Sequence, residues 1–378
     1  MKSYDYLIIG GGVSGVTAAE TLRENDEQAT IAIVDAEANT LYSRVQIPHY
    51  IKGVKERSQI FLRSSKDYDD KKIDLLLKKA AISVDTEQKI IKTNDASEFT
   101  YKKLLLTTGG TPKKLNKHKN ELYMHTIEDA DALKAVLTAP TLPERGIVIG
   151  SGFIATELVE AFKHYGLETH LCVAEKGFWA NFLSPEVSSM ITKLLSESGV
   201  IVHYGDRDLL SLDIDSSNSV TGVGIGLDVS ETIFSQAGVK FDGGLVTDEF
   251  LKTNVTDVFA SGDVVKFFSK KLNRQVKYGN WSNALVSGRF AALNMLGLDT
   301  SYDQLSSYST SARGVSIVFL GFSGMDEKTI TKTKVLSNRE AIQFFIREGK
   351  LDGCILINRA LDRKEYSEII EARRDFNG

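Results

Sequence analysis

The chain has 378 residues, of which 42% are hydrophobic and 25% are charged, a composition typical of a globular protein with two or three domains. The net charge of −4 argues against nucleic acid as a partner. No run approaches the roughly 18 consecutive apolar residues of a membrane-spanning helix, so a membrane protein is not expected.

The first predicted element is a strand over Tyr6 to Ile9 that runs directly into a glycine-rich turn. A helical pattern follows from Val13 to Leu22, and a second apolar run then ends at Asp35. In a dinucleotide-binding βαβ unit, the first glycine allows a tight turn, the second lets the backbone approach a pyrophosphate, and the third lets helix and strand pack closely. The N–H groups at the helix start hold the phosphates, and the later carboxylate binds ribose hydroxyls. The candidate binding residues are Gly10, Gly12, Ser14, Gly15 and Asp35.

Because this strand begins so near the N-terminus, we expect no signal peptide and a cytoplasmic protein. Short alternating strands are predicted next, over Lys79 to Val84 and over Lys89 to Thr93. Ala81, in the first of them, is included among the candidate cofactor contacts. The run from Tyr101 to Leu106 predicts a buried strand, which ends in the small-residue turn Thr108-Gly109-Gly110.

The glycine signature recurs 140 residues after its first occurrence, counted from Gly10 to Gly150. A predicted strand precedes it, a helical pattern runs from Phe153 to Tyr165, and the second apolar run ends at an acid 25 residues after the first glycine, as in the first copy. Ala155 takes the third small position, a permitted substitution. The candidate residues are Gly150, Gly152, Phe153, Ile154 and Glu175, with Gly226 in a later turn. Two such sites in one chain indicate that electrons pass between two bound dinucleotides.

Later in the chain, a strand is predicted from Val255 into a Gly262-Asp263 turn, followed by a helix from Trp281 to Leu296. After about residue 304 the composition changes, and a strand-rich and then helical segment closes the chain. Only two cysteines occur, Cys172 and Cys354, and neither belongs to a C-x-x-C pair, so an internal dithiol relay is excluded and both are expected in buried strands. The six histidines are scattered, so no metal site is predicted.

Together these motifs resemble the two-dinucleotide flavoproteins of the pyridine nucleotide-disulfide reductase superfamily. The resemblance covers nearly the whole chain and includes both glycine turns, the turn at Thr108 and Gly109, the segment Thr126 to Ala130, and the turn at Gly262. It implies an α/β fold with two Rossmann-like domains and a small α+β C-terminal domain. FAD is implied on the first site and NAD(P)H on the second, and Asp263 is expected to bind the ribityl chain of FAD. The expected domains are residues 1–113 with 244–303 for FAD, 114–243 for NAD(P)H, and 304–378 as an interface domain.

The stretch from Tyr42 to Ile51 is similar to two patterns within this superfamily. In NADH oxidases, peroxidases and coenzyme A-disulfide reductases, a C-G-L-P-Y-Y-I run supplies a redox cysteine, but Val45 falls on that place and carries no redox chemistry. The Y-x-R-P/V-x-L pattern of ferredoxin and rubredoxin reductases fits instead, through Tyr42, Arg44, Val45 and Ile47. The resemblance therefore implies hydride transfer from NADH to FAD, followed by electron transfer to a small iron–sulfur carrier, rubredoxin or ferredoxin.

The same resemblance suggests roles for individual residues. Glu175 favours NADH over NADPH, because a carboxylate suits a free 2′-hydroxyl and repels a 2′-phosphate, although Lys176 beside it weakens this preference. Glu157, expected in the first turn of the second helix, falls where the family carries a glutamate near the nicotinamide; a structural acid at a helix start is the alternative. His49 takes the place of a lysine that faces this glutamate in ferredoxin reductases. Histidine would pair with Glu157 only when protonated, and a surface position is the alternative.

Two further residues complete the candidate site. Trp281 begins a helix whose N-terminus would stabilise negative charge on the reduced flavin ring, with a role as a core anchor as the alternative. Its surroundings look like the E-H-W-x-N-A helix start of ferredoxin reductases and apoptosis-inducing factor, with Gly279-Asn280 in place of Glu-His. Arg44 is expected to contact the FAD phosphates, or to lie on the surface.

Three functions remain open on the sequence. The first is a reductase of an electron carrier. The second is a redox-sensing flavoprotein like apoptosis-inducing factor, and the third is a flavin NADH oxidase that needs no cysteine. The segment from residue 304 is shorter than the dimerisation domain of disulfide reductases, which favours a monomer over a homodimer.

Overall fold

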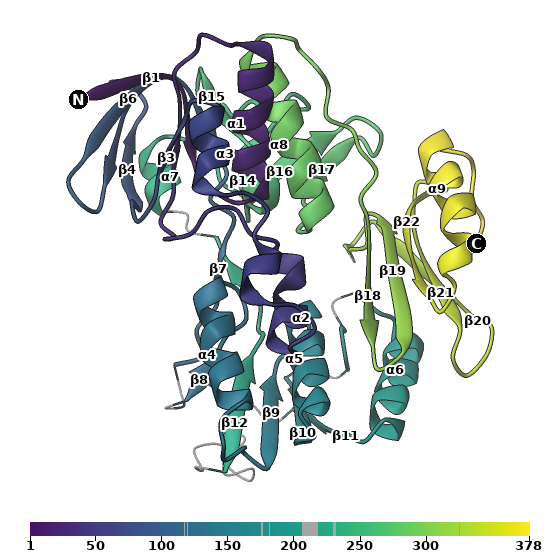
Figure 1. Cartoon of the computed structure of the whole chain (residues 1–378). Helices are drawn as coiled ribbons and strands as arrows, with labels where there is room; N and C mark the ends of the chain where they lie inside the picture. The colour runs from purple at the N-terminus through teal and green to yellow at the C-terminus, as the bar shows by residue number, and fades with distance from the viewer. Residues whose placement is uncertain are drawn as a thin grey trace. The chain divides into compact units, whose positions relative to one another are not determined.

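The computed structural model describes residues 1–116, 118, 120–174, 177–180, 182–205, 218–229, 232–324 and 326–378 (Figure 1). Its contacts divide the chain into two compact units. The first unit comprises Met1–Ser43, Arg57–Thr111 and Asp228–Gln304. The second unit comprises Arg44–Glu56, Pro112–Leu227 and Leu305–Gly378. Both units are α/β structures built on parallel sheets, which confirms the predicted fold class.

The first unit is built on a mainly parallel sheet in the order β3-β2-β1-β6, continued by antiparallel β5 and β4, with β15 beside β6. At one edge of this sheet, Ile9 pairs with both Val34 and Leu106, and Leu106 also pairs with Ala260. Because parallel strands end together at one edge, the residues that follow these strands gather there, where α/β sheets bind ligands. The strands are β1 (Lys2–Ile9), β2 (Ile31–Val34), β3 (Ile73–Leu76), β4 (Ala81–Asp85), β5 (Ile90–Thr93), β6 (Glu98–Leu106) and β15 (Val258–Ala260).

Two long helices of the first unit pack closely against each other (Figure 1). They are α1 (Val13–Asn25) and α8 (Trp281–Met295), and Gly288 permits their approach, because a Cβ there would lie 2.9 Å from the Cα of Ser14. The remaining elements are α3 (Ser65–Asp70), α7 (Thr232–Gln236), a small sheet of β14 (Leu245–Thr247), β16 (Val265–Ser269) and β17 (Arg274–Val276), and short 3-10 turns at Arg57–Ile60 and Gly262–Val264.

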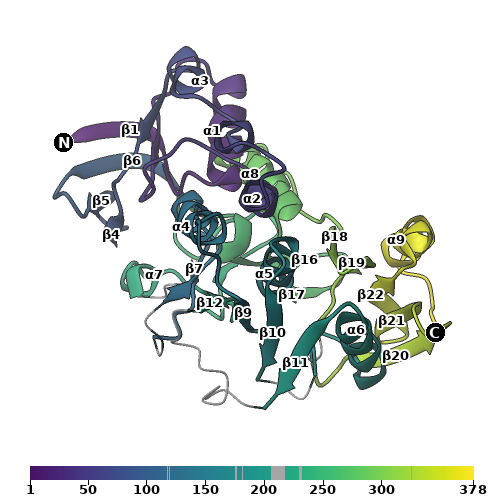
Figure 2. The same ribbon diagram turned by 60° about the horizontal axis from the view of Figure 1, so that its bottom comes forward.

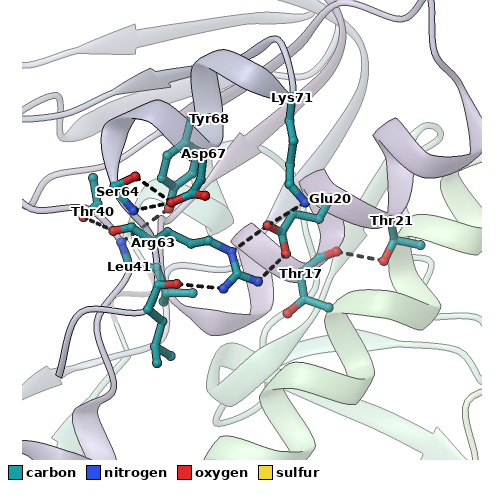
Figure 3. Close-up of polar contacts among 11 residues, drawn as sticks. Thr17, Glu20, Thr21, Thr40, Leu41, Arg63, Ser64, Asp67, Tyr68 and Lys71 are labelled. Atoms are coloured by element: carbon teal, nitrogen blue, oxygen red, sulfur yellow. Dashed lines mark hydrogen bonds and ion pairs between the residues drawn. The ribbon is translucent and has the colours of Figure 1, made fainter. Parts of the chain in front are cut away.

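A charged network fixes the segment after residue 60 to helix α1 (Figure 3). Arg63 Nε and Nη2 donate to the two carboxylate oxygens of Glu20 at 2.7 and 3.0 Å, and Lys71 lies 3.2 Å from the same group. Burial opposes ionisation of Glu20, but the hydrogen bonds from Arg63 and Lys71 outweigh it and hold the pKa of Glu20 below its usual value. The carboxylate therefore stays charged and anchors the loop on the helix.

The second unit holds a parallel sheet in the order β11-β10-β9-β12-β8. Helix α5 packs on its β9, β10 and β12 strands, and Gly146 and Gly222 provide the room, because a Cβ at either would lie within 3.0 Å of Phe162 or Leu158. The strands are β8 (Glu121–Leu122), β9 (Arg145–Ile149), β10 (Glu168–Val173), β11 (Val200–Tyr204) and β12 (Ser219–Val223), and the helices are α2 (Ile47–Ile51), α4 (Ile127–Leu137), α5 (Phe153–His164) and α6 (Pro185–Glu197). Two short strands, β7 (Thr111–Pro112) and β13 (Leu227–Asp228), pair with each other.

The chain ends in an antiparallel sheet in the order β18-β19-β22-β21-β20, which also belongs to the second unit (Figure 2). Helix α9 (Arg363–Ala372) packs against one face of it, over side chains such as Val318, Leu320 and Phe344. Helices α5 and α6 contact its β18 and β20 strands. The strands are β18 (Ser307–Ala312), β19 (Val315–Gly321), β20 (Ile330–Val335), β21 (Ala341–Arg347) and β22 (Lys350–Ile357).

The predicted elements correspond well to this structure. The expected strand-rich and then helical tail is confirmed, and Cys172 and Cys354 are buried in β10 and β22 as expected. The predicted domain boundaries stay a prediction; the contact units place residues 44–56 and 305–378 together with the second nucleotide-binding segment. Within the described part of the chain, no helix combines the length and apolar character needed to cross a membrane.

Candidate functional site

The signature glycines Gly10, Gly12 and Gly15 of the first turn differ in whether the fold itself requires them. Gly10 has φ +112°, and a Cβ there would lie 2.8 Å from the carbonyl carbon of Thr107. A Cβ at Gly15 would lie 2.8 Å from Thr107 Oγ1 and would also collide with the carbonyl oxygen of Gly10. Gly12 has an ordinary φ of −69°, and its Cβ would meet no atom of the described residues within 4 Å. The fold therefore requires Gly10 and Gly15, whereas Gly12 leaves open space of the kind a pyrophosphate occupies.

Thr107 was not among the predicted site residues, yet it fixes this turn to the end of β6. Its buried hydroxyl lies 3.0 Å from the carbonyl oxygen of Ile9 and 2.9 Å from that of Gly10. The predicted residues beside it differ: Thr108 is exposed, and Gly109 has φ +61°. Small polar residues at the end of a buried strand identified this segment in the sequence. That pattern did not show which of the two threonines faces the turn.

Asp35 lies against the glycine turn from the end of β2. A Cβ at Gly11 would overlap its carboxylate, so the acid and the turn lie in close approach. The role of Asp35 toward a ribose remains a prediction. The backbone N–H of Lys79 donates to the carbonyl oxygen of Asp35 at 2.8 Å. Ala81 follows at the start of β4, half-buried, where it pairs with Thr93. Ala81 thus lies two residues beyond the one that bonds to Asp35, and its role toward a cofactor remains a prediction.

The Gly262-Asp263 turn also lies at this edge. Ser14 and Ser261, both buried, share a hydrogen bond of 2.7 Å, and the N–H of Gly262 donates to Ser287 Oγ at 3.0 Å. Gly262 has φ +79°, and a Cβ there would lie 3.1 Å from that of Ser14. The structure thus brings together Ser14, Gly262 and Asp263, which come from segments about 250 residues apart, and adds Ser261 and Ser287, which the sequence did not identify.

The second turn repeats the same division of roles. Gly150 has φ +132°, and a Cβ there would lie 2.7 Å from the carbonyl carbon of Gly224, which itself packs on the backbone of Ala155. Gly152 has φ −98°, and among the residues with described positions nothing lies within 4 Å of where its Cβ would be. Both turns therefore keep a glycine at a position where neither the backbone angles nor the described neighbours require one.

The helices that follow the two turns also lack side-chain caps. Gly12 and Gly152 are the N-cap residues of α1 and α5, and no described side chain accepts a hydrogen bond from these helix starts. Side-chain oxygens cap α4, α6 and α8, in that order those of Thr126, Ser184 and Asn280, whereas the described side chains cap neither α2 nor α9. An uncapped helix start leaves N–H groups for an anion, and a bound phosphate satisfies them.

Apolar side chains are exposed beside the second turn. Ile154 is 38% exposed, and Ile225, next to Gly224, is 37% exposed. Gly226 has φ +102° and accepts a hydrogen bond from the N–H of Lys113 at 3.0 Å. A nucleotide bound at the turn would cover such apolar surface. The predicted Glu175, with Lys176, lies outside the described residues.

Glu157 is the fifth residue of α5, which places it in the second turn of the helix and corrects the predicted first-turn position. Burial raises the pKa of Glu157, Lys52 lowers it and Glu160 raises it, so that the effect of burial prevails. His49 is exposed on α2, and partial burial together with Lys52 and Lys55 lowers the pKa of His49. The cation that acts on Glu157 is therefore Lys52, one helical turn beyond His49.

Helix α2 is held firmly on the second unit. Tyr50 donates to Asp131 of α4 at 2.7 Å, and Tyr165, which follows α5, donates to the carbonyl oxygen of Ile51 at 2.7 Å. Lys134 lies over the ring of Tyr50 at 4.1 Å. Arg44 donates to the carbonyl oxygen of His125, just before α4. The role predicted for Arg44 at the FAD phosphates remains a prediction.

Trp281 is the first residue of α8 and is half-buried. The Asn280 side chain caps this helix by accepting the N–H of Asn283 at 2.9 Å. Nearby, burial lowers the pKa of Lys277, and the charge of Asp263 opposes that shift. Asp263 therefore lies close to a cation, while the roles of Asp263 and Trp281 toward a flavin remain predictions.

Comparison with known proteins agrees with this geometry. The family profile described as pyridine nucleotide-disulphide oxidoreductase matches residues 4–209 and 211–288. The 5,5'-dehydrodivanillate O-demethylase ferredoxin reductase subunit of Sphingobium sp. is 24% identical over 383 residues, which cover 96% of this chain and 92% of that protein. Human apoptosis-inducing factor 3 is 26% identical over 350 residues, 87% of this chain and 57% of that protein.

Among solved structures, the fold is similar to that of NADH:rubredoxin oxidoreductase from Clostridium acetobutylicum, with a TM-score of 0.86 and 19% identity. The match covers 100% of this chain and 97% of that one. With the family profile spanning both glycine turns and the Gly262-Asp263 turn, the chain belongs to the pyridine nucleotide-disulphide oxidoreductase family.

Proposed function

We propose that this protein is an FAD-dependent NADH oxidoreductase that delivers electrons to a small iron–sulfur protein of the ferredoxin or rubredoxin kind. The observation that carries the proposal is the pair of glycines, Gly12 and Gly152, that the fold itself does not require, each at the start of a helix that no described side chain caps. Two pyrophosphate sites in one chain suit a protein that brings two dinucleotides together. The ferredoxin reductase subunit that resembles the chain along nearly its full length supports the choice of acceptor.

The chain's own residues would bind and orient the cofactors. In the first unit, the start of α1 would hold the FAD pyrophosphate, Asp35 would accept hydrogen bonds from ribose hydroxyls, and Asp263 would bind the ribityl chain. In the second unit, the start of α5 would hold the pyrophosphate of NADH, and the carboxylate of Glu175 would favour NADH over NADPH. Bound FAD supplies the exchange between two-electron and one-electron transfer, which side chains cannot perform.

The cysteines support direct transfer to the acceptor. Val45 occupies the place of the family's redox cysteine and is 54% exposed. Cys172 and Cys354 are buried in sheets, and burial raises the pKa of the Cys354 thiol far above its usual value. Thiolates are the reactive form, so a buried neutral thiol is inert toward disulfide exchange. Electrons then leave the flavin without a protein disulfide.

Anaerobic stopped-flow spectroscopy tests the proposal. The FAD-loaded protein would be mixed with NADH or NADPH, and the reduced form would then be offered oxidised rubredoxin, ferredoxin, quinone or oxygen in separate arms. We expect rapid loss of the flavin band with NADH and rapid reoxidation by one of the two iron–sulfur proteins. Failure of both nucleotides to bleach the flavin would contradict the proposal.

A redox-sensing role is the second candidate, because human apoptosis-inducing factor 3 is similar over 87% of this chain. The same experiment separates the two. A reduced complex with NAD⁺ that persists in the presence of every carrier favours sensing. Rapid reoxidation by oxygen alone favours an NADH oxidase that needs no cysteine.

A further inference from the structure

Four aromatic rings meet at the first residue of α5. Phe153 directly follows Gly152, and its ring centroid lies 4.7 Å from that of Trp179, 5.4 Å from Tyr308 and 5.2 Å from Phe319. Tyr308 and Phe319 stack on each other, with centroids 4.8 Å apart and planes inclined by 2°. Tyr308 comes from β18 and Phe319 from β19, so the C-terminal sheet contacts the second glycine turn through this aromatic cluster (Phe153, Trp179, Tyr308 and Phe319).

The position of Trp179 is itself fixed by the C-terminal sheet. Trp179 is 2% exposed and has φ +55°, a conformation that a bulky side chain adopts only when its surroundings enforce it. The N–H groups of Phe182 and Leu183 both donate to its carbonyl oxygen at 2.8 Å. Gln343 of β21 then holds this turn, as it donates to the carbonyl oxygen of Phe182 at 2.6 Å and accepts the N–H of Ser184 at 2.6 Å.

An ion pair adds a further link along the same helix. The backbone N–H of Arg313 donates to Glu160 Oε1 at 2.6 Å, and its guanidinium lies 3.2 Å from Glu160 Oε2. Glu160 lies two turns beyond Phe153 on α5. The helix that begins at the second glycine turn is therefore held to the C-terminal sheet at its start and near its middle.

These contacts lie on the sheet face opposite to α9. Val318 and Leu320 of β19 pack in the cluster that includes Ile370 of α9. Side chains alternate along a strand, so Phe319 points to the other face. The same alternation in β21 separates Gln343 from Ile342 and Phe344, which also belong to the α9 cluster.

We infer that the C-terminal sheet is part of the pyridine-nucleotide site, where Tyr308, Phe319 and Trp179 act as positioning residues that hold Phe153 and the uncapped N–H groups of the first turn of α5 ready for a pyrophosphate. Stacked and edge-to-face rings add specific geometry to the burial they provide. A binding group held in place beforehand loses less entropy on binding, which strengthens affinity. This inference rests on the proposed binding of a pyridine nucleotide at Gly150 to Ala155.

The test is the affinity of the FAD-loaded full chain for NAD⁺, measured by isothermal titration calorimetry without any turnover. Tyr308→Ala removes a half-buried ring from the aromatic cluster, and Tyr308→Leu keeps an apolar side chain there if the alanine variant folds poorly. Both variants lose the pairs of Tyr308 with Phe153 and Phe319, and we expect the Kd for NAD⁺ to rise about three- to tenfold, the order of magnitude of an aromatic pair's energy. Tyr308→Phe keeps the stack and should retain the wild-type Kd within about twofold.

Tyr366→Ala is the matched control, because Tyr366 is also half-buried and packs on Phe344 from the α9 side of the same sheet. We expect its Kd for NAD⁺ and the FAD content of every variant to match the wild type. An unchanged Kd in Tyr308→Leu, or an equal rise in Tyr366→Ala, would overturn the inference while wild-type NAD⁺ binding still supported the proposed function. A wild-type protein that binds no NAD⁺ would overturn both.

Discussion

At the scale of single residues, the two glycine turns separate what the fold needs from what a ligand needs. Gly10 and Gly150 have a positive φ, and at each of them a Cβ would collide with the carbonyl group of another residue, Thr107 or Gly224. Gly12 and Gly152 have ordinary backbone angles and open space, so an alanine would fit the protein at either place. Replacing the two kinds of glycine should therefore give different results.

Gly152→Ala should weaken nucleotide binding without destabilising the protein. We expect its free energy of unfolding to change by less than about 1 kcal/mol, because the new methyl group meets no described atom and the backbone is compatible. The Kd for NAD⁺ should rise about tenfold or more, since the methyl group occupies the approach to the pyrophosphate. Urea unfolding and calorimetric titration measure the two quantities.

Gly150→Ala is the contrasting variant. Its backbone is strained for alanine, and its Cβ would press on Gly224, so we expect a loss of about 2 kcal/mol or more of unfolding free energy together with the loss of binding. Equal stability losses in Gly150→Ala and Gly152→Ala would show that the glycines have no separate roles.

Thr107→Val should loosen the first turn. The variant loses the hydroxyl that contacts the carbonyl oxygens of Ile9 and Gly10, at a cost of about 1 kcal/mol, because Ile9 still accepts the backbone N–H of Thr107. We expect faster release of FAD, followed by flavin fluorescence. Thr21→Val removes a comparable buried hydroxyl bond, to Thr17, further along α1 and should leave FAD release unchanged.

The ionisation of Glu157 predicts a pH dependence of stability. Burial raises its folded-state pKa above the usual 4.5, so keeping it charged costs stability as the pH rises through that folded pKa, and the cost is absent below about 4.5. Glu157→Gln removes the cost, and we expect a variant that is more stable than the wild type at pH 8, with a difference that shrinks toward pH 4. Thermal unfolding across this range measures it. Glu160→Gln should instead destabilise the protein, because it breaks the contact with Arg313. A Glu157→Gln variant that is less stable than the wild type at pH 8 would contradict the expected cost of burying a charged Glu157.

For single helices and strands, the sequence predicts the structure where interactions between neighbouring residues determine it. The side chain of Thr126 accepts the backbone N–H of Asp129, and the side chain of Asp129 accepts the backbone N–H of Thr126. The start of α4 was therefore predictable from four consecutive residues. The apolar runs before each glycine turn predicted buried parallel strands for the same reason. The partner of a short helix such as α2 could not be predicted, because Tyr50 and Asp131 lie 81 positions apart and their hydrogen bond leaves no local signal.

Tyr50→Phe tests how firmly α2 is held. The variant loses the hydrogen bond to Asp131 but keeps the ring under Lys134, and the loss of about 1 kcal/mol should speed amide hydrogen exchange about fivefold over residues 48–54. Tyr42→Phe removes a similar hydroxyl bond, to Glu37 in the first unit, and should leave this exchange unaffected. Unchanged exchange in Tyr50→Phe would mean that Asp131 does not restrain the helix.

In the whole molecule, each of the two units is built from three separate segments of the chain. This assignment of segments to units is the feature that the sequence predicts least. The glycine signatures predicted both glycine turns and the helices that follow them, because the turn chemistry is local and specific. The membership of the tail in the second unit depends on pairs such as Glu160 with Arg313 and Ser184 with Gln343, which are more than 150 positions apart. Composition revealed a change near residue 304 but not which element the tail would contact.

One chain that binds FAD and a pyridine nucleotide should transfer electrons between them. An anaerobic titration of the purified yellow protein with NADH, followed at the flavin absorption band, measures this transfer. We expect about one equivalent of NADH per bound flavin to remove the band completely, as a two-electron transfer between the cofactors requires. A colourless protein that takes up no FAD, or a flavin band that persists in excess NADH and excess NADPH, would contradict this expectation.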